Sequence, residues 1–250
     1  MLTLDRDKDE VIASDADLAI DIADLRFSWS ERDDPVLDIE RFQVSREERV
    51  FVQGPSGSGK STLLSLIAGV VTPQNGSIRV NGKPIHALSG PDRDRFRADH
   101  VGFIYQLFNL IPYLSVLENV TLPCRFSRRR QTRAQDRSLN VEAEALRLLG
   151  ELGMGDETVL RKTAIELSVG QQQRVAAARA LIGTPEIIIA DEPTSSLDEG
   201  HREAFLELLF KECDGADATM VYVSHDTTLG KNFGRTIRLA EVNFPGREPH

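Results

Sequence analysis

Residues 49–61, with the sequence RVFVQGPSGSGKS, place a short apolar run directly before a glycine-rich loop. The loop, Gly54–Ser61, fits the pattern G-x-x-x-x-G-K-[S/T] at every fixed position. The following residues, up to Ala68, carry apolar side chains at helical spacing. A strand, a glycine-rich loop and a helix in this order are the start of an α/β fold that binds phosphate.

Each residue type in this loop suits the binding of nucleotide phosphates. Gly57 and Gly59 allow main-chain N–H groups to point inward at phosphate oxygens, and the next helix directs its positive N-terminal end at them. Lys60 adds a full positive charge for the β- and γ-phosphates, and the Ser61 hydroxyl is suited to Mg²⁺. The nucleotide-binding residues predicted here are Gly54, Pro55, Ser56, Gly57, Ser58, Gly59, Lys60, Ser61 and Thr62.

A second motif, residues 187–192 with the sequence IIIADE, ends an apolar strand with two carboxylates. Ligands bind at the carboxyl ends of strands in α/β sheets. We therefore expect Asp191 to bind Mg²⁺ and Glu192 to polarise the attacking water as a general base. An acidic strand end that merely faces solvent is the alternative for this segment alone. Together, the two motifs predict a nucleoside triphosphatase.

The segment 167–171, LSVGQ, predicts the start of a helix, because Ser168 and Gln171 have the spacing of a capping box. It also resembles the signature sequence LSGGQ of the ABC (ATP-binding cassette) ATPases, and it stands about 20 residues before the acidic pair, as in that family. The resemblance implies that Ser168, Gly170 and Gln171 bind ATP. Val169 departs from the pattern, which usually has glycine there.

Other positions match the same family in the same order. The sequence PTSSLD resembles the D-loop and ends in Asp198, an expected nucleotide contact. His225 follows a predicted strand and resembles the switch histidine, which contacts the γ-phosphate. Gln106 resembles the Q-loop glutamine, whose amide reaches Mg²⁺ or the attacking water. Trp29 stands where the family has an aromatic residue that stacks on adenine, and Phe27 is the alternative.

The order of the predicted elements indicates an α/β fold, namely a P-loop NTPase core with a mostly parallel sheet. The resemblance adds an N-terminal antiparallel β subdomain and an inserted α-helical subdomain. We expect a disordered acidic tail over 1–17 and an ATPase domain over 18–240, with the helical insertion at about 107–182, followed by a C-terminal tail over 241–250. The pairs Asn75-Gly76 and Asn81-Gly82 predict tight turns.

Composition and charge restrict the function further. The net charge of −9 argues against general nucleic-acid binding, which needs a basic face. No apolar stretch approaches the roughly 20 residues of a membrane-spanning helix, and the N-terminus lacks the apolar core of a secretory signal. We expect Cys124 and Cys213 to be reduced thiols. The run Arg125–Arg133 predicts a solvated face or a mobile loop, or else contact with anionic lipid headgroups.

The segment 101–120, VGFIYQLFNLIPYLSVLENV, resembles the subfamily of lipoprotein-release and macrolide-efflux ATPases. The likeness implies ATP and Mg²⁺, a homodimer of cassettes, and an integral membrane permease that serves export, lipoprotein release or mechanotransmission. The chain is then expected at the cytoplasmic face of the inner (plasma) membrane.

Soluble ABC ATPases that act on nucleic acid or ribosomes are the alternative. Those proteins carry coiled coils, zinc sites or two cassettes, whereas this sequence has one phosphate loop, no heptad run and no cysteine cluster. A plain P-loop kinase or GTPase is a third possibility. The signature segment and His225 argue against it.

Overall fold

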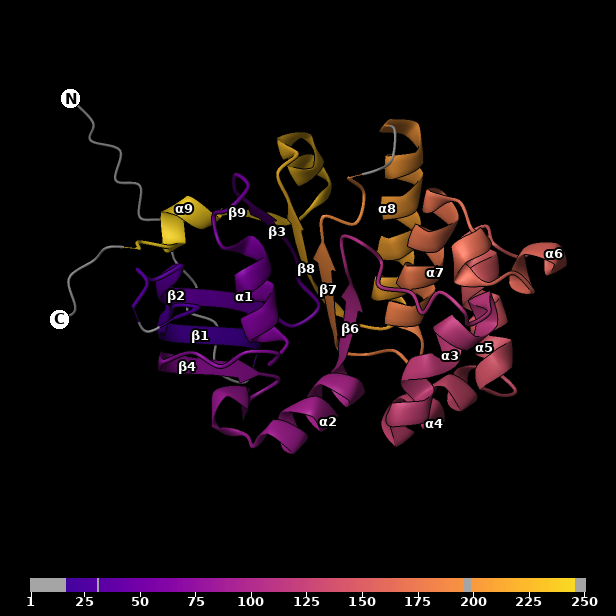
Figure 1. The fold of residues 1–250 in the computed structure, drawn as a ribbon, viewed down its shortest axis with the longest axis horizontal. Helices are drawn as coiled ribbons and strands as arrows, with labels where there is room; N and C mark the ends of the chain where they lie inside the picture. Colours follow the sequence, from indigo (N-terminus) through magenta and orange to yellow (C-terminus); the bar gives the residue numbers. More distant parts are fainter. Residues whose placement is uncertain (1–16, 31, 196–198, 246–250) are drawn as a thin grey trace, which may run out of the picture.

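The computed structural model describes residues 17–30, 32–195 and 199–245, which form two sheets and their covering helices (Figure 1). Its strands are β1 (Leu18–Phe27), β2 (Leu37–Ser45), β3 (Arg49–Gln53), β4 (Asn75–Val80), β5 (Lys83–Pro84), β6 (Val101–Ile104), β7 (Ile187–Asp191), β8 (Thr219–Ser224) and β9 (Arg235–Arg238). Its α-helices are α1 (Lys60–Ile67), α2 (Gly90–His100), α3 (Val116–Phe126), α4 (Arg128–Arg137), α5 (Val141–Glu151), α6 (Glu157–Leu160), α7 (Val169–Leu181), α8 (Glu199–Asp214) and α9 (Leu239–Val242).

The first sheet is antiparallel, with the strand order β2-β1-β4-β5. In β1, the buried side chains of Ile20 and Ile22 alternate with less buried ones up to Asp24, where a φ of +50° shifts the register against β4. Gly76 faces this irregularity, and a Cβ there would lie 2.3 Å from the Asp24 carbonyl oxygen. The turn predicted at Asn75-Gly76 is therefore wrong, because these residues begin β4, whereas the turn predicted at Asn81-Gly82 is confirmed between β4 and β5.

The second sheet contains only parallel pairs, in the order β6-β7-β8-β3-β9. Its side chains alternate between two apolar layers. Val50 and Val52 face the layer that contains α1, and Phe51 faces the layer built from α3, α5, α7 and α8. Helix α1 is buried because both sheets pack against it, which Figure 1 shows. The expected P-loop NTPase fold is confirmed.

Helices α3 to α7 stand between β6 and β7 in the chain and project to one side of the parallel sheet (Figure 1). Helix α2 was not predicted, because its only buried side chain is Phe96 and its apolar periodicity is weak. Ser89 and Pro91 mark its start as a capped helix, and this was the available signal. Among the described residues, no helix combines the length and the apolar character that crossing a bilayer demands.

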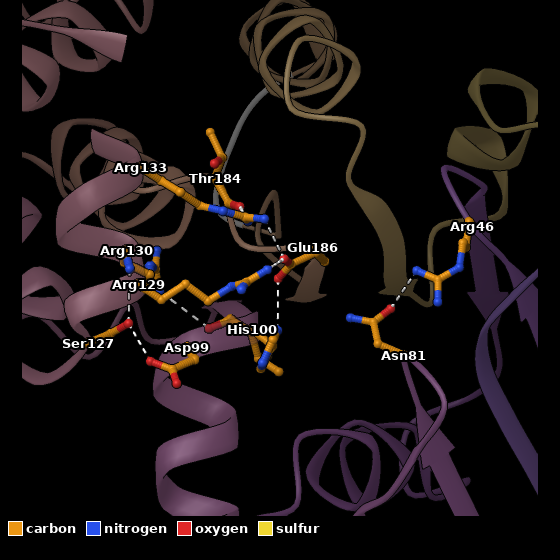
Figure 2. Close-up of polar contacts among 11 residues, drawn as sticks. Arg46, Asn81, Asp99, His100, Ser127, Arg129, Arg130, Arg133, Thr184 and Glu186 are labelled. Carbon is orange, nitrogen blue, oxygen red and sulfur yellow. Dashed lines mark hydrogen bonds and ion pairs between the residues drawn. The ribbon is translucent and has the colours of Figure 1, made fainter. Parts of the chain in front are cut away.

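The arginine-rich run forms the end of α3 and the first part of α4, and Arg129, Arg130 and Arg133 contact other segments of the chain (Figure 2). Arg130 is 3% exposed and donates to main-chain carbonyl oxygens, including those of Ile182 at 2.7 Å and Ala180 at 2.6 Å. Arg129 and Arg133 pair with Glu186, which directly precedes β7. The interpretation as a mobile loop is wrong, because these arginines lie in a helix and connect α4 to the end of α7 and to the residue before β7.

The last described residues pack on the antiparallel sheet. Asn243 Oδ1 accepts a hydrogen bond from the Asp38 N–H at 2.7 Å, and its Nδ2 donates to the Val36 carbonyl at 3.1 Å. The segment expected as a tail from residue 241 thus includes a residue bound to β2. The tail expected over 1–17 lies outside the described residues except for Asp17.

Candidate nucleotide-binding site

The glycine-rich loop joins β3 to α1 and leaves the start of that helix without a side-chain cap. Gly59 has φ +97°, a conformation that glycine adopts easily, and a Cβ there would lie 2.8 Å from Leu37 Cδ2. Gly59 is the N-cap residue of α1 and has no side chain that could accept a hydrogen bond from the first turn. Side-chain caps are present on α2, α3, α4, α5 and α7, from Ser89, Ser115, Ser127, Asn140 and Ser168. The N–H groups that open α1 are therefore available to phosphate oxygens.

Donor groups line the inside of the same loop. The Lys60 side chain is 6% exposed, and its ammonium group donates to the carbonyl oxygens of Gly54 and Pro55, both at 2.8 Å. Ser58 Oγ is buried and has no hydrogen-bond partner among the described residues. An unpaired buried hydroxyl is costly, so its presence beside Lys60 fits a site shaped for an anion with several oxygens.

The carboxylate of Asp191 lies at the carboxyl end of β7 and accepts a hydrogen bond from Ser61. Burial raises the pKa of Asp191, and this hydrogen bond opposes the rise. The two side chains supply neighbouring oxygen atoms from different elements, the donor type that Mg²⁺ prefers. Ser61 and Asp191, two of the three residues expected to bind the ion, thus lie together.

Glu192 lies between two charged or titratable side chains. Its Oε1 is 3.8 Å from Lys60 Nζ, and its Oε2 is 2.6 Å from His225 Nδ1. Its φ of +45° is unusual for a residue with a side chain, and its N–H donates to the Val223 carbonyl at 2.9 Å. The strands β7 and β8 therefore deliver Glu192 and His225 to one point beside the phosphate loop.

The residue expected to stack on adenine is exposed. Trp29 is 61% exposed and meets Phe27 edge to face at 5.1 Å, whereas Phe27 is 4% exposed and has no free face for a ligand. The Gln74 amide donates to the Ser28 carbonyl at 2.7 Å and accepts from the Ser28 N–H at 3.0 Å. These contacts of Gln74 with Ser28, the residue before Trp29, were not predicted from the sequence, because 46 residues separate the two positions.

The Q-loop glutamine follows the end of β6. Gln106 is exposed and lies in a turn two residues beyond β6, the strand that pairs with β7. Asp198 of the D-loop lies outside the described residues.

The signature segment caps α7 as expected. Ser168 Oγ accepts a hydrogen bond from the Gln171 N–H at 3.3 Å, and Gln171 Oε1 accepts from the Ser168 N–H at 3.0 Å. Ser168 and Val169 are exposed. Helix α7 covers the face of the parallel sheet opposite to α1. The structure does not bring Ser168 and Gly170 together with the phosphate loop of their own chain.

Comparisons with known proteins agree with this geometry. Residues 37–195 match the ABC transporter family. The chain is 37% identical over 210 residues to the lipoprotein-releasing system ATP-binding protein LolD of Hydrogenovibrio crunogenus, covering 84% of this chain and 87% of that protein. It is 35% identical over 221 residues to the macrolide export ATP-binding/permease protein MacB of Burkholderia thailandensis, covering 88% of this chain and 32% of that protein.

Among solved structures, the chain is similar to the dimeric ATP-binding cassette MJ0796 in a post-hydrolysis state bound to ADP and phosphate. The TM-score is 0.74 at 30% identity, and the match covers 92% of this chain and all of that one. The expected resemblance, including its lipoprotein-release and macrolide-export relatives, is confirmed. The chain belongs to the ABC transporter family, as an ATP-binding subunit that hydrolyses ATP.

Proposed function

We propose that two copies of this chain form a homodimer in which each ATP lies between the phosphate loop of one copy and the signature segment of the other. The observation that carries this proposal is the placement of α1 and α7 on opposite faces of the parallel sheet. Ser168 and Gly170 stand at an exposed helix N-terminus that is suited to a phosphate group but remote from the loop of the same chain. The dimeric state of the MJ0796 cassette supports the arrangement.

Within each site, the residues of this chain have separate roles. Lys60 and the N–H groups at the start of α1 bind the phosphates, Ser61 and Asp191 hold Mg²⁺ with help from Gln106, and Trp29 stacks on adenine. Bound Mg²⁺ supplies neutralisation of the phosphate charge. Glu192 accepts a proton from the attacking water, and its position 2.6 Å from His225 orients its carboxylate. Asp198 of the D-loop and Gln171 complete the nucleotide contacts.

The variant Glu192→Gln tests these roles. An amide has nearly the same shape as the carboxylate but is a poor base, so ATP binding is expected to persist while hydrolysis stops. Size-exclusion chromatography with ATP and Mg²⁺ is then expected to show a dimer, and Ser168→Glu is expected to abolish that dimer. Hydrolysis by Glu192→Gln at the parental rate would contradict the role of Glu192.

We further propose that the chain drives an integral membrane permease of the export or lipoprotein-release type, from the cytoplasmic face of the inner membrane. A groove of about 650 Å³ lies between α2 and α3; its lining combines apolar side chains, including Phe103, Leu122 and Phe126, with charged ones such as Asp94 and Arg179. Phe126 is 74% exposed. The loop that contains Gln106 follows β6, and Tyr105 and Asn109 on either side of Gln106 line this groove. MacB, by its name, carries ATP-binding and permease functions in one protein, which supports such a partner here.

Fractionation of cells tests the permease and the alternative soluble function. The chain is expected to co-purify with membranes, and Phe126→Glu is expected to release it while the ATPase activity of the isolated chain stays within about twofold of the parental value. Recovery of the native chain with ribosomes or DNA instead of membranes would replace transport with the soluble function.

A further inference from the structure

Tyr222 occupies an unusual place in the strand that delivers His225. It lies in β8 and is fully buried, with its ring on the sheet face covered by α7 and α8. Ring centroids of Phe51 and Phe233 are 6.1 and 5.1 Å from it, and these two rings are 5.3 Å from each other. Because aromatic neighbours confine the ring, they also confine the position of its hydroxyl.

The Tyr222 hydroxyl is 2.7 Å from Oγ1 of Thr194, which follows Glu192 by two residues. Thr194 is 2% exposed, so both hydroxyls are shielded from solvent. Neither can readily exchange this hydrogen bond for one with bulk water, and the loss of either partner leaves the other buried and unsatisfied.

The main chain beyond β7 requires a contact of this kind. The parallel ladder pairs Ala190 with Tyr222 and Asp191 with Val223, and Asp191 is the last residue of β7. Glu192 then takes a φ of +45°, which a residue with a side chain adopts only when its surroundings hold it there. The hydrogen bond between Thr194 and Tyr222 continues the attachment to β8 past the end of the ladder.

We propose that the Thr194–Tyr222 hydrogen bond is a positioning contact for hydrolysis, which holds Glu192 where its carboxylate meets His225. The two residue pairs close a small ring: Glu192 and Thr194 are two residues apart, Tyr222 and His225 are three apart, and side-chain contacts of 2.6 and 2.7 Å join them. Thr194 and Tyr222 act through Glu192 and are not themselves catalytic residues. The inference rests on the proposed roles of Glu192 and His225.

A double-mutant cycle in the full chain tests the contact. Tyr222→Phe removes only the hydroxyl, and Thr194→Val replaces the other hydroxyl with a methyl group. Each single variant is expected to lower kcat about tenfold with the KM for ATP within about twofold, because the phosphate loop is untouched. The double variant is expected to hydrolyse no more slowly than either single variant, because neither hydroxyl is left unpaired. Parental kcat in either single variant, a rise in KM without a fall in kcat, or losses that multiply to about a hundredfold would overturn the proposal.

Phe233→Leu is the matched control for packing. It loosens the same aromatic cluster but leaves both hydroxyls in place, so it is expected to lower the melting temperature while kcat stays within about twofold. A fall in kcat equal to that of Tyr222→Phe would attribute the effect to packing and refute the positioning role. The result for Glu192→Gln separates the two proposals: hydrolysis by that variant would contradict the role of Glu192, whereas an additive cycle with Glu192→Gln inactive would contradict only the positioning contact.

Discussion

Glu186 offers a quantitative test of how α4 is attached to the parallel sheet. Its carboxylate forms ion pairs with Arg129 and with Arg133, whose Nη2 lies at 2.7 Å, and it contacts the His100 ring nitrogen Nδ1 at 3.0 Å (Figure 2). The Glu186 side chain is 22% exposed. Burial alone would raise the pKa of Glu186, but hydrogen bonds from His100 and Arg129 together with the charge of Arg133 lower it to about 2. The ionised form is therefore more favourable in the folded protein than in the unfolded chain.

The pKa of Glu186 sets the size and sign of its effect on stability. A fall from 4.5 in the unfolded chain to about 2 in the folded protein corresponds to about 3 kcal/mol of stabilisation at neutral pH. Because the pKa is lowered on folding, this stabilisation is fully present above about pH 5 and is lost as the pH falls toward 2. From these two pKa values, about 1.5 kcal/mol of this stabilisation remains at pH 3.

Glu186→Gln removes the titrating group, and urea unfolding followed by circular dichroism measures the result. The free energy of unfolding is expected to fall by about 3 kcal/mol at pH 7, and the difference from the parental protein is expected to shrink by about half at pH 3. Glu203→Gln is the matched control, because its pair with Lys231 at 3.4 Å is solvent-exposed and such pairs contribute little. A loss that is equal at pH 7 and pH 3, or no loss at pH 7, would refute the reasoning.

Three further predictions concern other parts of the molecule. Trp29→Ala is expected to raise the KM for ATP roughly three- to tenfold and Trp29→Tyr to preserve it; an unchanged KM in Trp29→Ala argues against stacking. Arg130→Ala is expected to lower the free energy of unfolding by about 3 kcal/mol, because buried carbonyl oxygens lose their hydrogen-bond donors. The control Arg128→Ala, at an exposed position, is expected to change it by less than about 0.5 kcal/mol, and equal effects of the two variants in thermal unfolding would contradict the prediction. Gly102→Ala places a Cβ 2.2 Å from a carbonyl oxygen of α7 and is expected to lower the free energy of unfolding by about 2 kcal/mol or more. The control Gly90→Ala, where the Cβ meets open space, is expected to leave it unchanged, and a parental urea midpoint in Gly102→Ala would contradict the prediction.

Local sequence predicts the phosphate loop well because its requirements are local. The strand before the loop, the glycines that turn the backbone and the helix after it are contiguous, so residues 49–68 are sufficient to specify the element order. The acidic pair is predicted for the same reason, since the apolar strand and the two carboxylates at its end are contiguous in the sequence. Prediction was poor where periodicity is weak, as in α2, and at Gly76, whose role is set by the approach of a neighbouring strand.

The sequence by itself determined the family, the fold class and the candidate site residues, because each motif is a short run with its own backbone and chemical requirements. Only the tertiary structure decided which of those residues meet. It places Glu192 against His225 across 33 residues of sequence, and it separates the signature helix from the phosphate loop by putting them on opposite faces of one sheet. It also connects the arginine run of α4 to other parts of the chain, because the carbonyl oxygens and the carboxylate that bind these arginines come from segments about 50 residues away. Contacts of this range depend on strand order and packing, which no local pattern encodes.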